Sequence, residues 1–190
     1  MKNVVYFHGI HGDTQKSIAP FLEKEFAKLN IKTYYPKFFN DGEAFYENFK
    51  TVADDLFSQG LLGENTIVIA HSIGNSFSTR YLCEKNISPL AFVSLAGYCD
   101  SFDLNNPDVK NQINKALPTD VHLLHIKTHA KTRISLYSND HLIPENLLKN
   151  FSKKIDSKLY YLENKGHFGR RHGIQELPEL IEILKENKLI

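Results

Sequence analysis

The chain has 190 residues, of which 42% are hydrophobic and 24% are charged, and its formal net charge is +1. A chain of this length fits one ordinary domain. Its nearly neutral charge lacks the basic excess through which proteins bind nucleic acids by bulk electrostatics. We therefore expect one globular domain over residues 1–190 and no nucleic-acid partner.

The apolar segments and the cysteines bear on where the protein works. No segment approaches the roughly 20 apolar residues of a membrane-spanning helix, and the run Val4–Phe7 is too short for a signal peptide. Two cysteines, Cys83 and Cys99, are too few for a disulfide framework or a thiolate metal site. These features predict a cytoplasmic protein without a membrane span, and they do not indicate an oligomeric state.

Apolar runs with strand composition alternate with segments of helical periodicity along the chain. Strands are expected at Asn3–Phe7, Ile31–Tyr35, Thr66–Ala70, Leu90–Ala96, Thr132–Tyr137 and Leu159–Leu162. Helices are expected around Ile18–Leu29 and at Ala44–Ser58, Ile73–Lys85, Glu145–Lys153 and Glu176–Glu186. This alternation predicts an α/β fold with about six mostly parallel strands and helices on both faces of the sheet.

The loop after the first expected strand reads F-H-G-I-H-G over residues 7–12. A site for acyl transfer needs two backbone amides to stabilise the tetrahedral oxyanion. One amide is usually that of the residue after the nucleophile and the other comes from a loop of this kind. Gly9 would let the backbone turn close to the nucleophile, so we expect the amide of Ile10 to be one of the two donors.

The third expected strand ends in A-H-S-I-G, residues 70–74, at a boundary between strand and helix. This pattern differs from the G-x-S-x-G nucleophile elbow only in Ala70, which replaces the first glycine. The turn requires small residues two positions before and after the serine, and alanine is about the largest that fits. We interpret Ser72 as a nucleophile, Ile73 as the other oxyanion donor, and Gly9 and His71 as substrate contacts. The alternative is a serine that only caps its helix.

A nucleophilic serine needs a histidine as base and usually a carboxylate that orients the histidine. In enzymes built on this elbow the order along the chain is serine, acid, histidine. Asp140 follows the fifth expected strand, and His167 follows the last one between two glycines that give its loop freedom. The sequence therefore predicts a Ser72, Asp140, His167 triad.

Two alternatives concern the acid of this triad. Asp140 is also placed to cap the helix that begins near Pro144. Asp100 and Asp103, after the fourth expected strand, are the reserve carboxylates.

The segment of residues 99–130 is a polar, helix-biased insert between the fourth and fifth expected strands. It leaves the sheet at the carboxyl edge, where open α/β folds bind ligands. We expect it to form a lid whose apolar residues, Leu117 and Leu124 among them, contact the substrate.

Two further groups of residues carry weaker signals. His122, His125 and His129 are spaced to share one helix face, and three imidazoles can bind zinc. A serine triad requires no metal, so we expect neither a metal nor a cofactor and interpret these histidines as exposed. The positive residues near His167 are expected to be solvated surface charge, with attraction of an anionic substrate as the alternative: Lys165, Arg170, Arg171 and His172.

These motifs resemble those of the small serine hydrolases of the retinoblastoma-binding-protein-9 and YdeN type, which are minimal α/β-hydrolases. The resemblance covers nearly the whole chain and is carried by F-H-G-I-H-G, I-A-H-S-I-G, S-N-D-H-L-I-P and N-K-G-H-F-G. It implies the Ser72, Asp140, His167 triad and carboxylesterase-like chemistry on a small-molecule acyl substrate. The chain departs from the pattern at Ala70 and in having no tryptophan, so the resemblance implies no substrate preference.

The function that the sequence favours is that of a serine esterase acting through an acyl-serine intermediate. The alternative is a protein-binding module on a hydrolase fold, with weak or vestigial catalysis, because a fold does not by itself define an activity.

Overall fold

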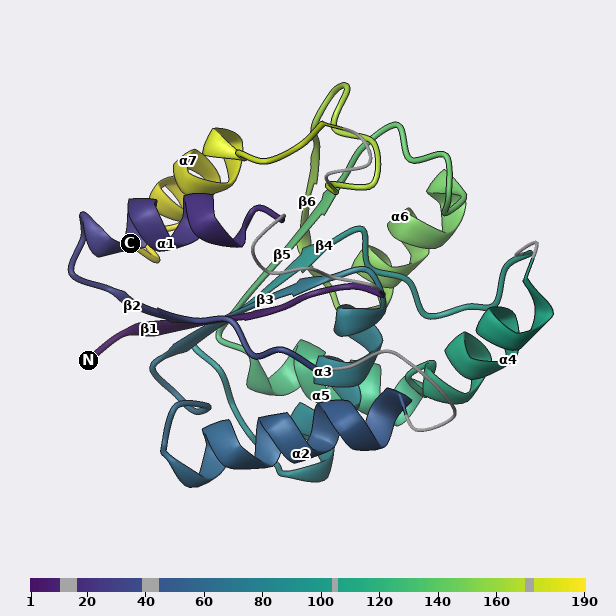
Figure 1. Cartoon of the computed structure of the whole chain (residues 1–190), viewed down its shortest axis with the longest axis horizontal. Helices are drawn as coiled ribbons and strands as arrows, with labels where there is room; N and C mark the ends of the chain where they lie inside the picture. The colour runs from purple at the N-terminus through teal and green to yellow at the C-terminus, as the bar shows by residue number, and fades with distance from the viewer. Residues whose placement is uncertain (11–16, 39–44, 104–105, 170–172) are drawn as a thin grey trace.

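The computed structural model describes residues 1–10, 17–38, 45–103, 106–169 and 173–190 (Figure 1). The strands are β1 (Asn3–Phe7), β2 (Lys32–Tyr34), β3 (Thr66–His71), β4 (Ala91–Leu95), β5 (Thr132–Tyr137) and β6 (Lys158–Tyr161). The helices are α1 (Ala19–Ala27), α2 (Phe45–Ser58), α3 (Ile73–Glu84), α4 (Pro107–Ala116), α5 (Asp120–His129), α6 (Glu145–Lys154) and α7 (Pro178–Glu186).

The strands of the described residues form one six-stranded sheet in the order β2-β1-β3-β4-β5-β6, and every neighbouring pair is parallel. The sequence-based prediction of six strands in an α/β arrangement is confirmed, and the sheet is parallel throughout rather than mostly so. From β1 the chain passes to β2 on one side, whereas from β3 it proceeds to β6 on the other. In open α/β sheets, ligands bind at the carboxyl ends of the strands where the strand order reverses in this way, here between β1 and β3.

Helices cover both faces of the sheet. Figure 1 shows α1 and α7 on one face and α2, α3 and α5 on the other. The central strands are buried along nearly their whole length, as their unbroken apolar runs predicted. Within the described ranges, no helix is both long and apolar enough to cross a bilayer.

The expected strand boundaries differ from the observed ones by at most one residue. The edge strand β6 begins at Lys158, one residue earlier than predicted, and its side chains are mostly exposed, so its apolar pattern is weak. The last helix starts at Pro178 instead of Glu176, since proline is favoured in the first turn of a helix. The predicted helix start at Ala44 lies outside the described residues.

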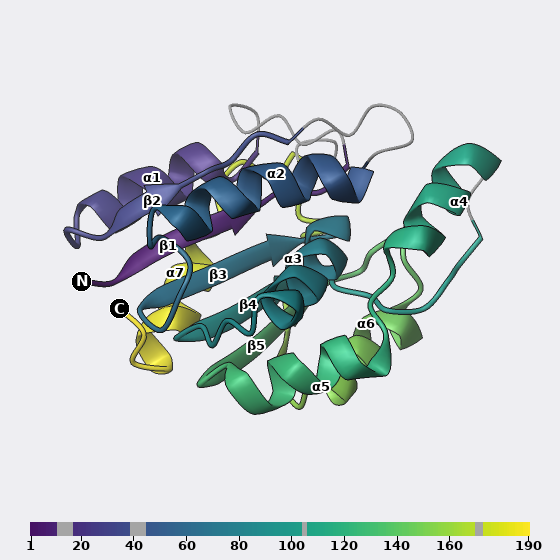
Figure 2. The same cartoon turned by 90° about the horizontal axis from the view of Figure 1, so that it is seen from below.

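The insert of residues 99–130 contains two helices with different surroundings. Figure 2 shows α4 projecting beyond the carboxyl ends of the strands, while α5 lies along the sheet. Helix α5 packs against α3 and α6 and returns the chain to β5, so it is the crossover helix of this strand pair. The lid expected over the whole insert stays a prediction, and α4 is the helix of the insert that extends past this edge of the sheet.

Helix α3 begins in direct backbone contact with the end of β1. A Cβ atom on Gly74 would lie 2.6 Å from the carbonyl oxygen of Phe7 and 2.7 Å from that of His8. These distances are shorter than any side chain tolerates, and the backbone of a buried strand has little room to move aside. Only glycine permits this approach, which brings the first turn of α3 over the end of β1.

We expect Gly74→Ala to lower the free energy of unfolding by about 1–2 kcal/mol, because a contact with buried backbone lies at the upper end of the cost of overpacking. Overpacking against backbone costs about 1–3 kcal/mol, and it opposes the roughly 1 kcal/mol by which alanine is favoured over glycine in a helix. Urea denaturation measures the change. The control is Gly63→Ala, because a Cβ atom at Gly63 meets nothing within 4 Å. Equal stability of Gly74→Ala and the wild type would contradict the close approach.

Candidate active site

Ser72 stands at the sharp turn between β3 and α3. Its backbone has φ 54° and ψ −126°, a conformation that non-glycine residues adopt only when the surrounding structure holds them there. The Ser72 amide donates to the carbonyl oxygen of Leu95 at 2.9 Å. The buried Asn75 side chain donates to the carbonyl oxygens of Ser72 at 3.0 Å and Leu95 at 3.1 Å. The turn is thus fixed from β4 and from the first turn of α3.

The structure brings Ser72, His167 and Asp140 together in a chain of hydrogen bonds. Ser72 Oγ lies 2.9 Å from His167 Nε2, and His167 Nδ1 lies 2.5 Å from Asp140 Oδ2. The histidine side chain is 12% exposed and the aspartate side chain 1%. With Asp140 ionised, His167 donates from Nδ1, so its Nε2 is free to accept the serine proton.

Asp140 also caps the turn that follows it. Its Oδ1 accepts from the amides of Leu142 at 2.8 Å and Ile143 at 3.2 Å. Burial alone would raise the pKa of Asp140, but the bond from His167, its charge and these two amides together hold the pKa below its usual value. The carboxylate is therefore ionised at neutral pH. The capping alternative and the triad use different oxygens of the same side chain.

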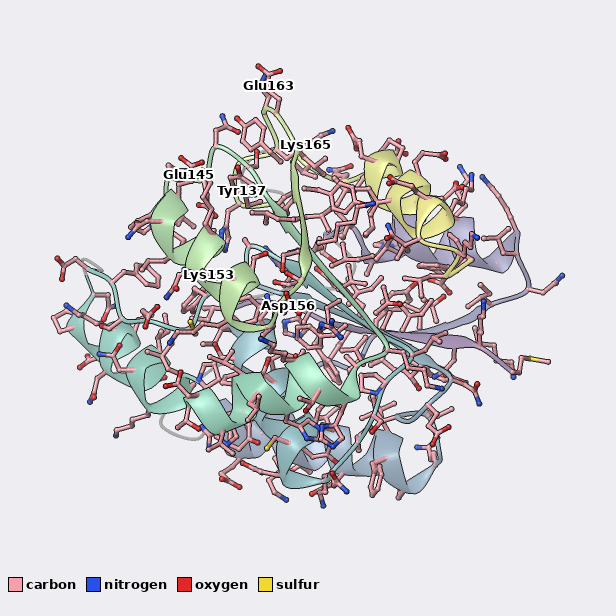
Figure 3. All side chains as sticks on the ribbon, turned by 180° about the vertical axis from the view of Figure 1, so that it is seen from behind. Tyr137, Glu145, Lys153, Asp156, Glu163 and Lys165 are labelled. Atoms are coloured by element: carbon pink, nitrogen blue, oxygen red, sulfur yellow. The ribbon has the colours of Figure 1, made fainter. Side chains whose placement is uncertain are left out.

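The loops that carry Asp140 and His167 are joined by polar contacts that were not predicted from the sequence. Ser138 Oγ accepts from the amide of Lys165 at 2.9 Å, and Asn139 Oδ1 accepts from the amide of Gly166 at 3.4 Å. Figure 3 shows Lys165 on the loop after β6, beside the end of β5. The one available signal was the run of short polar residues directly before Asp140, which are common in loops.

The path of the His167 loop depends on left-handed backbone. Gly166 before the histidine and Phe168 after it have φ of 50° and 53°. Phe168 is 1% exposed, so its ring anchors the loop in the core and holds the uncommon conformation. Lys165 of the same loop forms an ion pair with Glu179 of α7 at 2.6 Å. The side chain of His167 is thereby directed back toward Ser72.

The loop after β1 lies against the serine. A Cβ atom on Gly9 would be 3.0 Å from Ser72 Cβ, so glycine is the residue that fits there. His8 fixes this loop: its Nδ1 donates to the Gly9 carbonyl oxygen at 2.7 Å, and its ring stacks on Phe38 with centroids 3.9 Å apart. Ile10 follows and is half-buried.

The other expected oxyanion donor, Ile73, is the first residue of α3. Amides in the first turn of a helix have no partner within the helix and point out of its N-terminus. Ile73 directly follows Ser72, and Gly9 places the residue after it, Ile10, near the same side chain. The assignment of these two amides as oxyanion donors stays a prediction.

The His71 ring contacts the backbone of the His167 loop, a position that the sequence did not indicate. Its Nε2 lies 2.7 Å from the backbone carbonyl oxygen of His167, so this ring nitrogen is occupied by protein. Burial, reinforced by the nearby His167, lowers the pKa of His71 to about 3. The ring is neutral at physiological pH.

Other expected site residues lie apart from the triad. Asp100 accepts a bond from Asn150 of α6 at 2.6 Å, and Asp103 is paired with Lys110 at 2.7 Å on the surface. Neither reserve acid contacts His167, because each is held by a different partner. Leu117 directly follows α4 and is half-buried, whereas Leu124 is 56% exposed on α5. The crossover packing of α5 leaves Leu124 on its outer side.

The three histidines of the insert differ in exposure: His129 is exposed as predicted, His122 is half-buried, and His125 is buried. His122 caps the start of α5 at the Thr119 amide, and the buried His125 contacts the Ile87 carbonyl oxygen at 2.9 Å through Nε2. His129 stacks on His125. In the parts of the chain that the structure covers, no group of three His, Cys, Asp or Glu side chains is arranged to hold a metal ion. Arg170, Arg171 and His172 lie outside those parts.

Comparison with solved structures defines the class of fold. The crystal structure of the ydeN gene product from Bacillus subtilis aligns with a TM-score of 0.84 at 22% identity, covering 98% of both chains. A carboxylesterase structure from the thaumarchaeon Nitrososphaera gargenis aligns at 0.73 and 13% identity, covering 97% of this chain and 89% of the other. Est1E from Butyrivibrio proteoclasticus aligns at 0.70 and 16% identity, covering 99% and 87%. The fold is that of an α/β-hydrolase.

Sequence comparison narrows this class to a family. A model of the serine hydrolase family matches residues 59–186, which is more than half of the chain. YdeN from Bacillus subtilis (strain 168) is 22% identical over 187 residues, covering 96% of this chain and 94% of YdeN. The chain belongs to the serine hydrolase family, and the predicted likeness to the YdeN type is confirmed. The likeness to retinoblastoma-binding protein 9 stays a prediction.

Proposed function

We propose that the protein is a carboxylesterase-like hydrolase that cleaves small esters through an acyl-serine intermediate, with Ser72, His167 and Asp140 as its catalytic residues. The observation that carries the proposal is the continuous hydrogen-bond chain from Ser72 Oγ through the two ring nitrogens of His167 to Asp140. The proposal retains the cytoplasmic location predicted from the cysteine content.

The acylation step uses each of the three side chains. Ser72 Oγ attacks the ester carbonyl carbon while its proton passes to His167 Nε2. Asp140 stabilises the imidazolium that forms and holds the ring in the required tautomer. The tetrahedral intermediate collapses when the imidazolium returns the proton to the leaving alkoxide. An alcohol departs and the acyl group remains on Ser72.

Deacylation repeats these transfers with water. His167 accepts a proton from water, whose oxygen attacks the acyl carbon, and then returns a proton to Ser72 Oγ as the carboxylic acid leaves. In both steps the backbone amides of Ile73 and Ile10 would stabilise the oxyanion. Each such donor is worth about 3 kcal/mol of barrier height. This chemistry requires no cofactor.

The substrate class rests on the relatives. The structural neighbours include proteins described as carboxylesterases, and Est1E has been crystallised with ferulic acid. These properties belong to those proteins, at identities of 16% or less. Together with the triad they favour small carboxylic esters as the substrates of this chain.

We expect Ser72→Ala to fold normally and to lose at least about a thousandfold in kcat on p-nitrophenyl esters, since the nucleophile alone is removed. Asp140→Asn should lower kcat by roughly 10⁴-fold, because the amide favours the wrong tautomer of His167.

Asp103→Asn is the matched control, because its carboxylate is held by Lys110 on the surface and its removal should leave kcat unchanged. A loss of activity in Asp103→Asn with full activity in Asp140→Asn would show that the acid has been misassigned. Full activity of Ser72→Ala would refute the assignment of Ser72 as the nucleophile.

Helix α4 is proposed to act as the lid of this site. Asn106 caps its start through bonds to the amides of Asp108 at 3.0 Å and Val109 at 3.2 Å. Its last turn is anchored on α3, because Arg80 donates to the Lys115 carbonyl oxygen at 3.1 Å. A helix fixed at this end and projecting past the carboxyl edge is placed to cover an acyl chain bound at Ser72.

Leu117→Ala is therefore expected to change relative kcat/KM across esters of different acyl chain length, by about tenfold or less, since a few methylenes in an apolar pocket are worth about 1–3 kcal/mol. Leu124→Ala is the control and should leave the profile unchanged, because Leu124 faces outward on α5. The assignment of the lid to α4 would be refuted if Leu117→Ala left the dependence of kcat/KM on acyl chain length as in the wild type. It would also be refuted if Leu124→Ala changed that dependence.

A further inference from the structure

His71, the last residue of β3, contacts the loop that carries His167. Its Nε2 lies 2.7 Å from the His167 backbone carbonyl oxygen, and the two rings have centroids 5.0 Å apart. A carbonyl oxygen only accepts hydrogen bonds, so His71 carries a proton on Nε2 and donates it. A central strand of the sheet thus holds the main chain of the catalytic histidine directly.

The other side of the His71 ring faces the loop after β1. A Cβ atom built on Gly9 would lie 3.4 Å from His71 Nδ1 and 3.0 Å from Ser72 Cβ. The ring therefore lies between the loop of the expected oxyanion donor Ile10 and the loop of His167. The ring therefore sets the distance between the loop after β1 and the loop that carries His167, both of which lie next to Ser72.

The neutral state of the His71 ring is compatible with its position beside His167. Its ring is neutral at physiological pH. During catalysis His167 becomes an imidazolium, and a second positive ring 5.0 Å away would disfavour that state. A neutral ring that donates one hydrogen bond holds the loop without opposing the charge.

The contacts of the His167 loop act on different parts of it. Asp140 bonds the ring and sets its rotation, whereas Ser138 holds the amide of Lys165 two residues earlier. The His71 bond is the contact at the main chain of His167 itself. We propose that His71 is a positioning residue, which keeps the backbone of His167 at the place where its Nε2 reaches Ser72 Oγ. The inference rests on the proposed esterase function.

The test compares two substitutions that differ in one donor. His71→Phe keeps a flat ring and lacks the N–H group, while His71→Gln places an amide N–H near the former Nε2. A misplacement of about 1 Å in a catalytic group can cost 10²-fold. We therefore expect kcat on p-nitrophenyl esters to fall about 30- to 100-fold in His71→Phe with KM changed less than about threefold, and His71→Gln to recover kcat to within about fivefold of the wild type.

His125 offers a matched control. Its ring likewise contacts a backbone carbonyl oxygen through Nε2, that of Ile87 at 2.9 Å, and His125 is buried whereas His71 is half-buried. Ile87 precedes β4, so this bond lies at the opposite edge of the sheet from Ser72. His125→Phe should lower the melting temperature as His71→Phe does, while leaving kcat unchanged.

Several results would overturn the inference. A rise in KM with unchanged kcat in His71→Phe would make His71 a substrate contact, as the sequence had suggested. Equal losses of kcat in His71→Gln and His71→Phe, or a similar loss in His125→Phe, would show that the donated bond is not the cause. Wild-type kcat in both His71 variants would remove this inference alone. No ester turnover by the wild type would remove the proposed function and this inference with it.

Discussion

The arrangement of the site depends on one backbone conformation, the turn at Ser72. A non-glycine residue at φ 54° and ψ −126° is strained, and such residues cost on the order of 1–3 kcal/mol. Because the turn is sharp, the Ser72 side chain projects from the end of β3, and the amide of Ile73 lies in the first turn of α3. Buried packing maintains the strain: Leu95 of β4 and Asn75 of α3 bond the turn, and Gly74 lets the helix lie on the end of β1.

The remaining two members of the proposed triad are held mainly by polar contacts between loops. Asp140 is buried and ionised because backbone amides and His167 together satisfy its oxygens. The His167 loop in turn is bonded by His71 from the centre of the sheet and by Ser138 from the end of β5. Buried polar networks of this kind favour a single geometry when every member is paired. Under the proposed function, these contacts organise the site before a substrate binds, which is the condition for electrostatic stabilisation of a transition state.

The sequence predicted those features that follow from local pattern. Unbroken apolar runs marked the buried strands, and the small residues around Ser72 marked the elbow. The order of Ser72, Asp140 and His167 predicted three side chains that the structure places within hydrogen-bond distance. Contacts between distant segments were not predictable: His71 and His167 are separated by 96 positions, and no periodicity links them. The role of α5 was missed because its apolar residues alternate with histidines, and the burial of His125 depends on its bond to Ile87.

The central claim is that Ser72 is a nucleophile activated by the folded site, and covalent labelling tests it most directly. The protein is treated with a small fluorophosphonate at pH values from 6 to 9, and the modified peptide is identified by mass spectrometry. The account predicts one phosphonyl group on Ser72 in the native protein and none after unfolding in urea, since an isolated serine hydroxyl is a poor nucleophile. No adduct in the native protein at any of these pH values, or an adduct on another serine, would contradict it.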